Sequence, residues 1–503
     1  MPPHGESAIM VETRKCRLDT LGTNELTPKT AVSWSNDMTV HMNETILNSD
    51  LSKMSFKQAN SGSQQNGQSV NSFTTGNGYT SNQHSDGRHE NSMRSSDVNR
   101  SDQLATQLDN ISFDCDTNDT KIGRVEAIDH VTFWVGNAKQ AASFYMTQFG
   151  FEPFAFRGLE TGTRDLACHV VRLNEAIIQF VSPVEPNNVV INEFITRHGD
   201  AIKDIAFEVT NIEHLLQHVL SAGAELVHEL ETVYVQPTCD SPTGKEHRVK
   251  RATIKTFGDV THTFIERNYE YSIGKFLPGY QKPSLKLAPA FANLPVVPIQ
   301  EIDHIVGQFP PNKLDEITEW YSRVLNFRRY WSVDEKQIFT DHSGVKSHVM
   351  TNYNEKVKMP LCEVTLSKIA KSKAEEFVRY NYGSGIHHIA LRTNDIVAAV
   401  AHMRERGMDF LHTPDTYYSQ LKERLKECAV NITQDIERLR ELKILVDFDE
   451  QGYLLQIFTR PVQDRPTLVF EIIQRFNHDG FGAGNFLALF KAIEAETALR
   501  GNL

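Results

Sequence analysis

Large apolar residues are sparse in the first part of the chain and become regularly spaced from about residue 121 onward. The earlier part contains the run "KQANSGSQQNGQSVNSFTTGNGYTSNQHSDGRHENSMRSS", which is rich in Ser, Asn, Gln and Gly. Such a segment cannot bury enough apolar surface to offset the entropy lost on ordering. The sequence therefore predicts a disordered extension over residues 1–120, serving as a regulatory or tethering arm or as an inert extension.

From residue 121 onward the hydrophobic pattern occurs twice. The stretch "AIDHVTFWV" at 127–135 resembles "EIDHIVGQF" at 301–309, and each has the apolar run of a buried strand followed by a helical segment. In the second helical segment, apolar residues recur at the three-to-four spacing of a buried stripe, at Leu314, Ile317, Tyr321 and Leu325.

A second pair of stretches also matches, "DIAFEVTNIEHLLQHVLSAGAEL" from residue 204 and "HIALRTNDIVAAVAHMRERGMDF" from residue 388. Gly223 and Gly407 fall at the same offset, where a helix C-cap is expected. Each half thus consists of two strand–helix–strands modules, which predicts an α+β fold built by duplication. The predicted halves are residues 121–280 and 281–503, joined by the proline-rich connection "KPSLKLAPAFANLPVVP".

Three predicted strands of the second half carry residues that could bind one metal ion. His304 lies on the first strand, His388 on the strand that opens the second module, and Glu471 on the last strand, "TLVFEIIQR". Two imidazoles and one carboxylate form the facial triad that suits non-haem Fe(II), and they leave positions open for O₂ and a chelating substrate. A single His on an apolar strand is more often a core residue, but matching positions in a duplicated module favour the metal site.

The corresponding residues of the first half are interpreted as His130, Asp204 and Glu266. His130 could be a ligand, but Asp204 at the position equivalent to His388 argues against a metal site in the first half. We expect the first half to be a structural partner without metal.

His387 immediately precedes the candidate ligand His388. Neighbouring residues of a strand point to opposite faces of the sheet. His387 is therefore expected to face away from the partners of His388, and to serve in packing or in support of the ligand.

Charge and composition narrow the range of functions. A formal net charge of -12 argues against an electrostatic nucleic-acid surface. The chain lacks a run of about 18 apolar residues, which argues against a membrane span, and its first residues lack an apolar signal core. The six cysteines include no CxxC pair, which argues against a disulfide framework or a structural zinc site. We expect a cytoplasmic protein.

The C-terminal run "GYLLQIFTRPVQDRPTLVFEIIQRFNHDGFGAGNFLALFKAIEAE" resembles the 4-hydroxyphenylpyruvate dioxygenase family, above all in "QDRPT" and "GFGAGNF". The resemblance spans roughly residues 121–503. It implies tandem vicinal-oxygen-chelate modules, each βαβββ, that form two open barrel-like halves. It further implies one Fe(II) per chain, bound only in the C-terminal half by His304, His388 and Glu471.

The resemblance also implies an activity and an assembly. The family converts 4-hydroxyphenylpyruvate, an aromatic 2-oxo acid that chelates the iron, and O₂ to homogentisate and CO₂ in tyrosine and phenylalanine catabolism. A homodimer is expected. The substrate pocket is implied to consist of aromatic walls, polar lining residues and the start of a closing C-terminal helix, at Phe458, Phe481, Ser347, Gln456, Asn485 and Phe486.

Three pocket positions depart from the family pattern. Cys362 and Lys373 stand where the family has Asn and Gln, and His387 stands where it has Gln. Together with Ser347 these positions form the polar network around the substrate in the family. The metal site should survive these changes, whereas the orientation of the substrate ring could differ.

The altered network leaves alternatives open. A paralogue with the same iron and substrate could hydroxylate the benzylic carbon and give 4-hydroxymandelate. A ring-cleaving extradiol dioxygenase or a glyoxalase-type lyase would share the module and the triad, but would explain neither "QDRPT" nor "GFGAGNF". A non-catalytic scaffold is disfavoured by the intact triad.

Overall fold

The computed structural model describes residues 123–235, 247–268, 275–283, 293–333, 345–364, 373–426, 428 and 430–501. These residues belong to one compact unit. The predicted extension over residues 1–120 lies outside the described residues, as does the middle of the proline-rich connection, residues 284–292. None of the described helices is long and apolar enough to cross a membrane.

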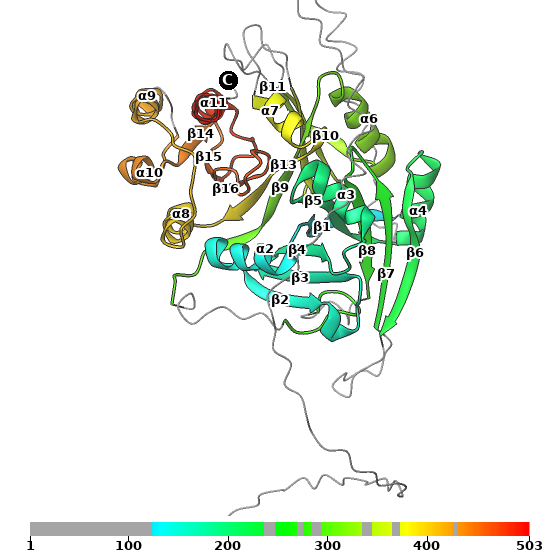
Figure 1. Ribbon diagram of the computed structural model, residues 1–503. Helices are drawn as coiled ribbons and strands as arrows, with labels where there is room; N and C mark the ends of the chain where they lie inside the picture. Colours follow the sequence, from blue (N-terminus) through cyan, green and yellow to red (C-terminus); the bar gives the residue numbers. More distant parts are fainter. Residues whose placement is uncertain are drawn as a thin grey trace, which may run out of the picture. The chain divides into compact units, whose positions relative to one another are not determined.

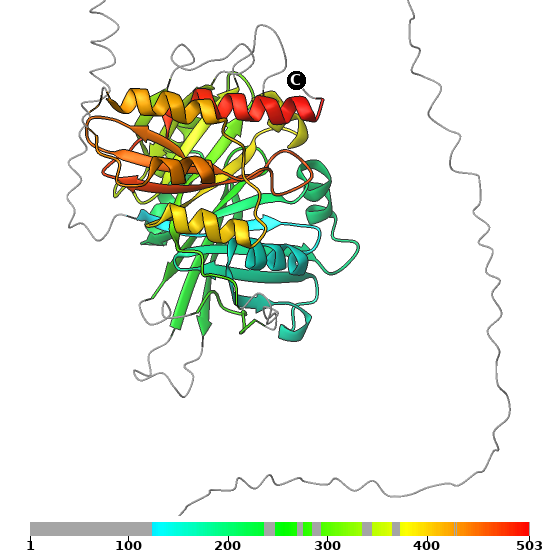
Figure 2. The same ribbon diagram turned by 90° about the vertical axis from the view of Figure 1, so that its left-hand side faces the viewer.

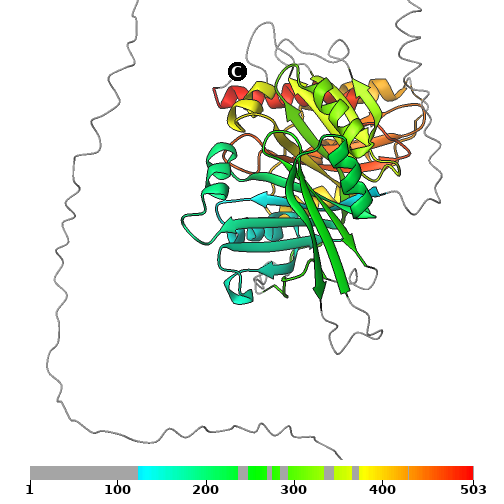
Figure 3. The same cartoon turned by 90° about the vertical axis from the view of Figure 1, so that its right-hand side faces the viewer.

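Two eight-stranded mixed sheets with flanking helices form the framework, which confirms the predicted α+β fold (Figure 1). The strand order of the first sheet is β2-β3-β4-β1-β5-β8-β7-β6. Its strands are β1 (Arg124–Trp134), β2 (Glu152–Arg157), β3 (Leu166–Leu173), β4 (Ala176–Pro183), β5 (Ala201–Thr210), β6 (Leu226–Val235), β7 (His247–Lys255) and β8 (Thr261–Arg267). Its helices are α2 (Ala138–Phe144), which a π-helical turn over Tyr145–Phe149 continues, α3 (Val189–His198) and α4 (Ile212–Ser221). Figure 3 shows β6 and β7, in green, as a long pair at the edge of this sheet.

The second sheet repeats this order as β10-β11-β12-β9-β13-β16-β15-β14. Its strands are β9 (Ile299–Phe309), β10 (Arg328–Val333), β11 (Val345–Thr351), β12 (Lys358–Val364), β13 (Gly385–Thr393), β14 (Leu445–Phe448), β15 (Tyr453–Phe458) and β16 (Val469–Phe476). Its helices are α6 (Leu314–Leu325), α7 (Lys373–Tyr380), α8 (Ile396–Glu405), α9 (Asp415–Lys426), α10 (Ile436–Leu442) and α11 (Phe486–Leu499). In Figure 2, α9 and α11 run along the same side of this sheet.

The same βαβββ module underlies all four quarters of the two sheets. In each module the first and last strands pair in parallel, as in β1 with β4 and β13 with β16. The first strands of the two modules in a half then pair antiparallel, as in β9 with β13. This order places β9, β13 and β16 side by side, so that residues from three distant segments can converge.

Local signals in the sequence explain the helices. Every member of the predicted apolar stripe of α6 is buried, as its three-to-four spacing requires. Gly223 and Gly407 follow α4 and α8 with φ of +88° and +90°, a left-handed conformation that glycine adopts without a Cβ clash. Both predictions are confirmed.

The two halves share one hydrophobic core. The ring of Phe470 on β16 packs edge-on against Phe149 and Tyr145, with centroids 4.7 and 5.6 Å apart. A polar contact also joins the two halves, since His262 Nε2 lies 2.9 Å from the Tyr321 hydroxyl. Burial raises the pKa of Tyr321, so this hydroxyl keeps its proton.

Arg465, within the "QDRPT" segment, fastens the ends of two helices from different halves. Its guanidinium donates to the carbonyl oxygens of Thr196 and Arg197 at the end of α3, at 3.0 and 2.5 Å, and to that of Tyr380 at the end of α7, at 3.3 Å. Helix C-termini carry unsatisfied carbonyls and a partial negative charge, which a cation stabilises. Gly199, left-handed with φ of +73°, leaves room for this side chain.

We expect Arg465→Gln to lower the free energy of unfolding by about 1–3 kcal/mol, because it removes charge-assisted hydrogen bonds at two helix ends. Urea denaturation of the variant and the unmodified chain measures this. Arg438→Gln is the matched control, since Arg438 pairs only with exposed groups of its own helix in the described contacts, and it should change stability by less than about 0.5 kcal/mol. Equal losses of stability in the two variants would contradict the proposed role of Arg465 at the two helix ends.

Candidate metal centre and substrate pocket

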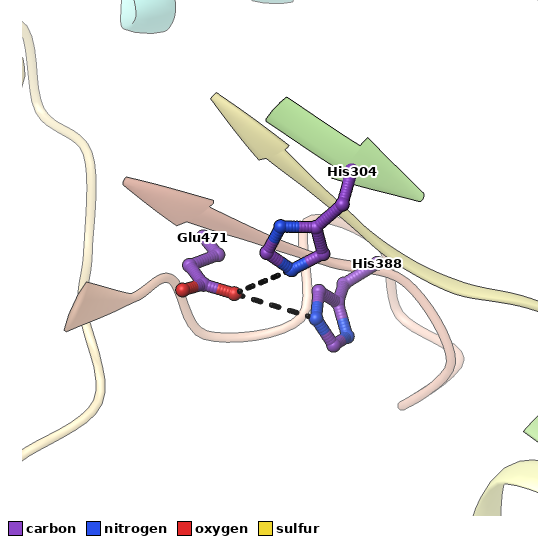
Figure 4. Close-up of side chains that lie close together, drawn as sticks. All are labelled: His304, His388 and Glu471. Carbon is purple, nitrogen blue, oxygen red and sulfur yellow. Dashed lines mark ion pairs between the residues drawn. The ribbon is translucent and has the colours of Figure 1, made fainter. Parts of the chain in front are cut away.

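Three side chains from adjacent strands meet in the second half (Figure 4). Glu471 Oε2 lies 3.3 Å from His304 Nε2 and 3.5 Å from His388 Nε2. One nitrogen or oxygen atom from each residue lies within 4.8 Å of the others. The side chains of His304 and Glu471 are almost fully buried, at 3% and 4% exposure, and that of His388 is 13% exposed. Within the described residues this is the one cluster of three or more potential metal-binding side chains.

The spacing of these atoms suits one divalent metal ion. Ligand atoms about 2.1 Å from a metal, at right angles to each other, are separated by about 3 Å. The two distances to Glu471 Oε2 need only small adjustments to reach that value. Two imidazoles and one carboxylate on one side of the ion are the donors that suit Fe(II) with open coordination positions.

A buried ion pair supports His304 at its Nδ1 atom. His304 Nδ1 lies 2.7 Å from Asp303 Oδ1, and Arg475 donates to both oxygens of Asp303 at 2.9 and 2.7 Å. Burial opposes ionisation of Asp303, but the hydrogen bonds from Arg475 and His304 outweigh it and hold the pKa of Asp303 well below its ordinary value. An ionised carboxylate keeps a proton on Nδ1, so that Nε2 is the nitrogen that gives up its proton when a metal binds.

Glu471 is likewise favoured as an anion. Its burial by itself would raise the pKa, but the adjacent His304 and His388 imidazoles lower it below its ordinary value. An ionised carboxylate can bind a cation without first losing a proton.

His387 lies closer to the site than strand alternation predicts. The β9–β13 register shifts between Ile386 and His388, which marks a bulge where the alternation of side chains fails. The Nδ1 atoms of His387 and His388 consequently lie 2.7 Å apart. This contact agrees with the expected role of His387 in packing or in support of the ligand, although strict alternation of the side chains fails at the bulge. The ring of Phe377 on α7 packs edge-on against that of His387.

The strand register also corrects the equivalence between the halves. The pairing of β5 with β8 places Thr263, rather than Glu266, at the position that Glu471 occupies in the second sheet. Glu266 accepts a hydrogen bond of 2.8 Å from Ile212 N at the start of α4. Gln474, the residue equivalent to Glu266, caps α8 in the same way. The predicted equivalence of Glu266 with Glu471 is therefore wrong.

In the first half, Asp204 is hydrogen-bonded by two threonine hydroxyls. Asp204 Oδ1 lies 2.6 Å from the Thr261 hydroxyl and 2.9 Å from that of Thr263. Burial raises the pKa of Asp204, which disfavours its anionic form. Phe276 packs edge-on against His130 at 4.8 Å and belongs to an apolar cluster that occupies this part of the half. Asp204 and His130 thus have contacts within the first half, and the absence of a metal there stays a prediction.

Aromatic rings flank the candidate ligands of the second half. Phe481 meets His304 edge-on at 5.1 Å, and Phe458 meets His388 edge-on at 5.6 Å. Trp331 on β10 packs against Phe481 at 5.7 Å, a contact that the sequence did not indicate. The two predicted aromatic walls thus stand beside the two imidazoles.

Two buried carboxamides lie at the turn that leads into α11. Gln456 and Asn485 are fully buried, yet neither side-chain atom of Gln456, nor Asn485 Nδ2, has a hydrogen-bond partner among the described residues. Such orphaned groups are costly unless a bound molecule or water satisfies them. A Cβ atom at Gly482, whose φ is +75°, would overlap the Gln456 carboxamide, so this position of "GFGAGNF" requires glycine. Both amides thus have hydrogen-bonding capacity that the described residues leave unused.

The remaining predicted pocket residues are placed as follows. Ser347 on β11 and Cys362 on β12 are paired across the strands, with the Cys362 thiol 3.3 Å from the Ser347 hydroxyl. Phe486 is half-buried in the first turn of α11, where its ring stacks with that of Phe490. Lys373 is the first residue of α7, and its side chain lies outside the described residues.

Asp303 and Arg475 were not identified from the sequence, although a signal exists. "IDH" occurs in both halves, and Asp129 in the first half makes the same contacts, with His130 at 2.6 Å and with Arg267. A pair retained in both halves could have been found by comparing the residues next to each histidine.

We expect Asp303→Asn to weaken Fe(II) binding about 10- to 100-fold, because the neutral amide no longer balances Arg475 or favours the required tautomer of His304. Fe(II) titration against a competing chelator measures this. Asp129→Asn makes the equivalent change in the first half and should leave Fe(II) affinity unchanged. An unaltered affinity in Asp303→Asn would contradict the supporting role.

Comparison with known proteins agrees with this architecture. The family model described as Glyoxalase/Bleomycin resistance protein/Dioxygenase superfamily matches residues 127–240 and 301–457. The 4-hydroxyphenylpyruvate dioxygenase of Xenopus tropicalis is 48% identical over 381 residues, which cover 76% of this chain and 94% of that protein. The enzyme of the same name from Dictyostelium discoideum is 44% identical over 383 residues, which cover 75% of this chain and all of that protein, 100%.

Solved structures show the same fold. A triple mutant of 4-hydroxymandelate synthase from Streptomyces coelicolor superposes with a TM-score of 0.60 at 28% identity, covering 74% of this chain and 99% of that chain. The curated relatives are considerably more similar to this chain, and they match it over nearly their whole length. The chain belongs to the 4-hydroxyphenylpyruvate dioxygenase family.

Proposed function

We propose that this protein is an Fe(II)-dependent dioxygenase that converts 4-hydroxyphenylpyruvate and O₂ to homogentisate and CO₂. The observation that carries the proposal is the cluster of His304, His388 and Glu471 in a chain of this family. Residues 281–503 would carry out catalysis, and residues 121–280 would serve as a metal-free scaffold. The names of the relatives supply the substrate and the reaction.

His304, His388 and Glu471 would hold the iron, which when bound supplies coordination positions for the 2-oxo acid and O₂ and activates the latter. Asp303 and His387 would hold the two imidazoles in orientation through their Nδ1 atoms. The ligand geometry would then be set before the substrate arrives.

The pocket residues would bind and orient the substrate. Phe458 and Phe481 offer apolar faces and edges to a phenyl ring, and the Gln456 and Asn485 carboxamides offer hydrogen bonds to its polar groups. The Ser347–Cys362 pair would contribute a short polar contact in place of a longer amide.

Helix α11 would exclude water from the reaction. Its residues Leu489 and Ile493 pack against Phe458 and Val469. Two polar contacts hold its end, since Glu376 on α7 lies 2.7 Å from Arg500 Nη2 and 3.4 Å from the Thr497 hydroxyl. A closed, dry pocket strengthens electrostatic interactions and limits side reactions.

We also propose a cytoplasmic homodimer. The cytoplasmic assignment rests on the composition, since the cysteines include no CxxC pair, and the dimer rests on family resemblance. Light scattering at several protein concentrations would measure the mass in solution.

The activity is tested by loading the full-length chain with Fe(II) without oxygen, adding 4-hydroxyphenylpyruvate and air, and identifying the product. Homogentisate with uptake of one O₂ per product is expected. 4-Hydroxymandelate would show that the altered positions Cys362, Lys373 and His387 redirect the reaction. Iron binding without oxygen uptake would refute the proposed activity.

The ligand assignment predicts different outcomes for two adjacent histidines. His388→Ala should abolish Fe(II) binding, because it removes one of three ligands. His387→Gln should retain the iron, because Gln can still accept a hydrogen bond from His388 Nδ1. Iron content after gel filtration distinguishes the two, and loss of iron from His387→Gln would refute the assignment.

A further inference from the structure

Helix α9 covers the free edge of the second sheet. β14 is the last strand of that sheet, so Val446 presents an outward N–H and C=O that no strand satisfies. The Tyr417 hydroxyl lies 2.8 Å from Val446 N and 2.9 Å from Val446 O. The neighbouring Tyr418 hydroxyl donates to Ile444 O at 3.0 Å. Two adjacent, buried tyrosines thus bind the same strand edge.

Tyr417 makes one further contact, with the turn that begins α11. Its hydroxyl lies 2.7 Å from Asn485 Oδ1. Burial raises the pKa of Tyr417, so the hydroxyl keeps its one proton, and Asn485 Oδ1 is a nearer acceptor for that proton than Val446 O. Because Oδ1 accepts from Tyr417, the other amide atom, Nδ2, faces away from it.

Asn485 Nδ2 is the buried atom that lacks a partner among the described residues. The Asn485 backbone N donates to Gly482 O at 2.9 Å, and the Gln456 carboxamide lies directly against Gly482. Two amides with unused hydrogen-bonding capacity therefore lie at one turn. That turn begins the helix whose side chains cover Phe458.

We propose that Tyr417 is a positioning residue, which fixes the orientation of the Asn485 carboxamide, fastens the start of α11 over the pocket, and leaves Nδ2 as a donor to the bound 2-oxo acid. The role toward substrate rests on the proposed function, whereas the fastening of α11 does not. Tyr417 lies on α9 and acts only through Asn485. A single hydroxyl therefore links the edge of the sheet to the closing helix.

The pair Tyr417→Phe and Tyr418→Phe isolates this hydroxyl. Both variants keep the ring and lose a hydrogen bond to the β14 edge, but only the first loses the contact with Asn485. In the full-length, Fe(II)-loaded protein, Tyr417→Phe should accelerate amide hydrogen exchange over residues 482–490 about tenfold and leave the iron content unchanged. Tyr418→Phe should leave exchange in that segment unchanged. Equal exchange in the two variants would overturn the proposal.

Turnover of 4-hydroxyphenylpyruvate tests the role toward the substrate. Tyr417→Phe should lower kcat/KM about five- to tenfold, a loss of the size expected for one hydrogen bond. In a chain that already carries Asn485→Ala, the same change should cost nothing further, whereas additive losses would overturn action through Asn485. If the unmodified chain does not turn over this substrate, the proposed function fails, and hydrogen exchange still decides the fastening of α11.

Discussion

Burial of the Glu471 carboxylate sets the arrangement of the second half. An isolated buried charge costs several kcal/mol unless partners compensate it, and here two imidazoles from neighbouring strands provide that compensation. The strand order β9-β13-β16 is what brings these side chains together. Arg475, four residues further along the same strand, holds Asp303 against the back of His304. Strand β16 thus supplies both the Glu471 carboxylate and the Arg475 guanidinium that holds Asp303 beside His304.

Duplication explains why the first half retains this support without the site. Asp129 and Arg267 repeat the pair found behind His304. The first-half residues equivalent to the metal centre differ instead. Asp204 is hydrogen-bonded to threonine hydroxyls, and Phe276 packs against His130. Losing one partner of a buried ion pair is costly, because the other charge is left uncompensated. This cost favours retention of the pair even where it supports no metal ligand.

Helix α11 combines polar attachment at its two ends with apolar packing between them. Polar contacts hold both ends of α11, at Asn485 and at Arg500, while Leu489 and Ile493 lie against the aromatic wall between them. Hydrogen bonds fix orientation, and apolar contacts tolerate small shifts. The helix therefore has a defined orientation, while its apolar side tolerates small shifts.

Features that repeat along the chain could be predicted from the sequence, because periodicity and matched offsets need no knowledge of neighbours. The two halves, the stripe of α6, the glycines Gly223 and Gly407 at helix ends, and the histidines His304 and His388 follow from such patterns, whereas Glu471 was matched to the wrong residue of the first half. Tertiary structure alone decided the register that makes Thr263 the counterpart of Glu471, and the bulge that turns His387 toward His388. It also decided contacts such as Tyr417 with Asn485, because side chains 68 positions apart meet only through the packing of the whole chain.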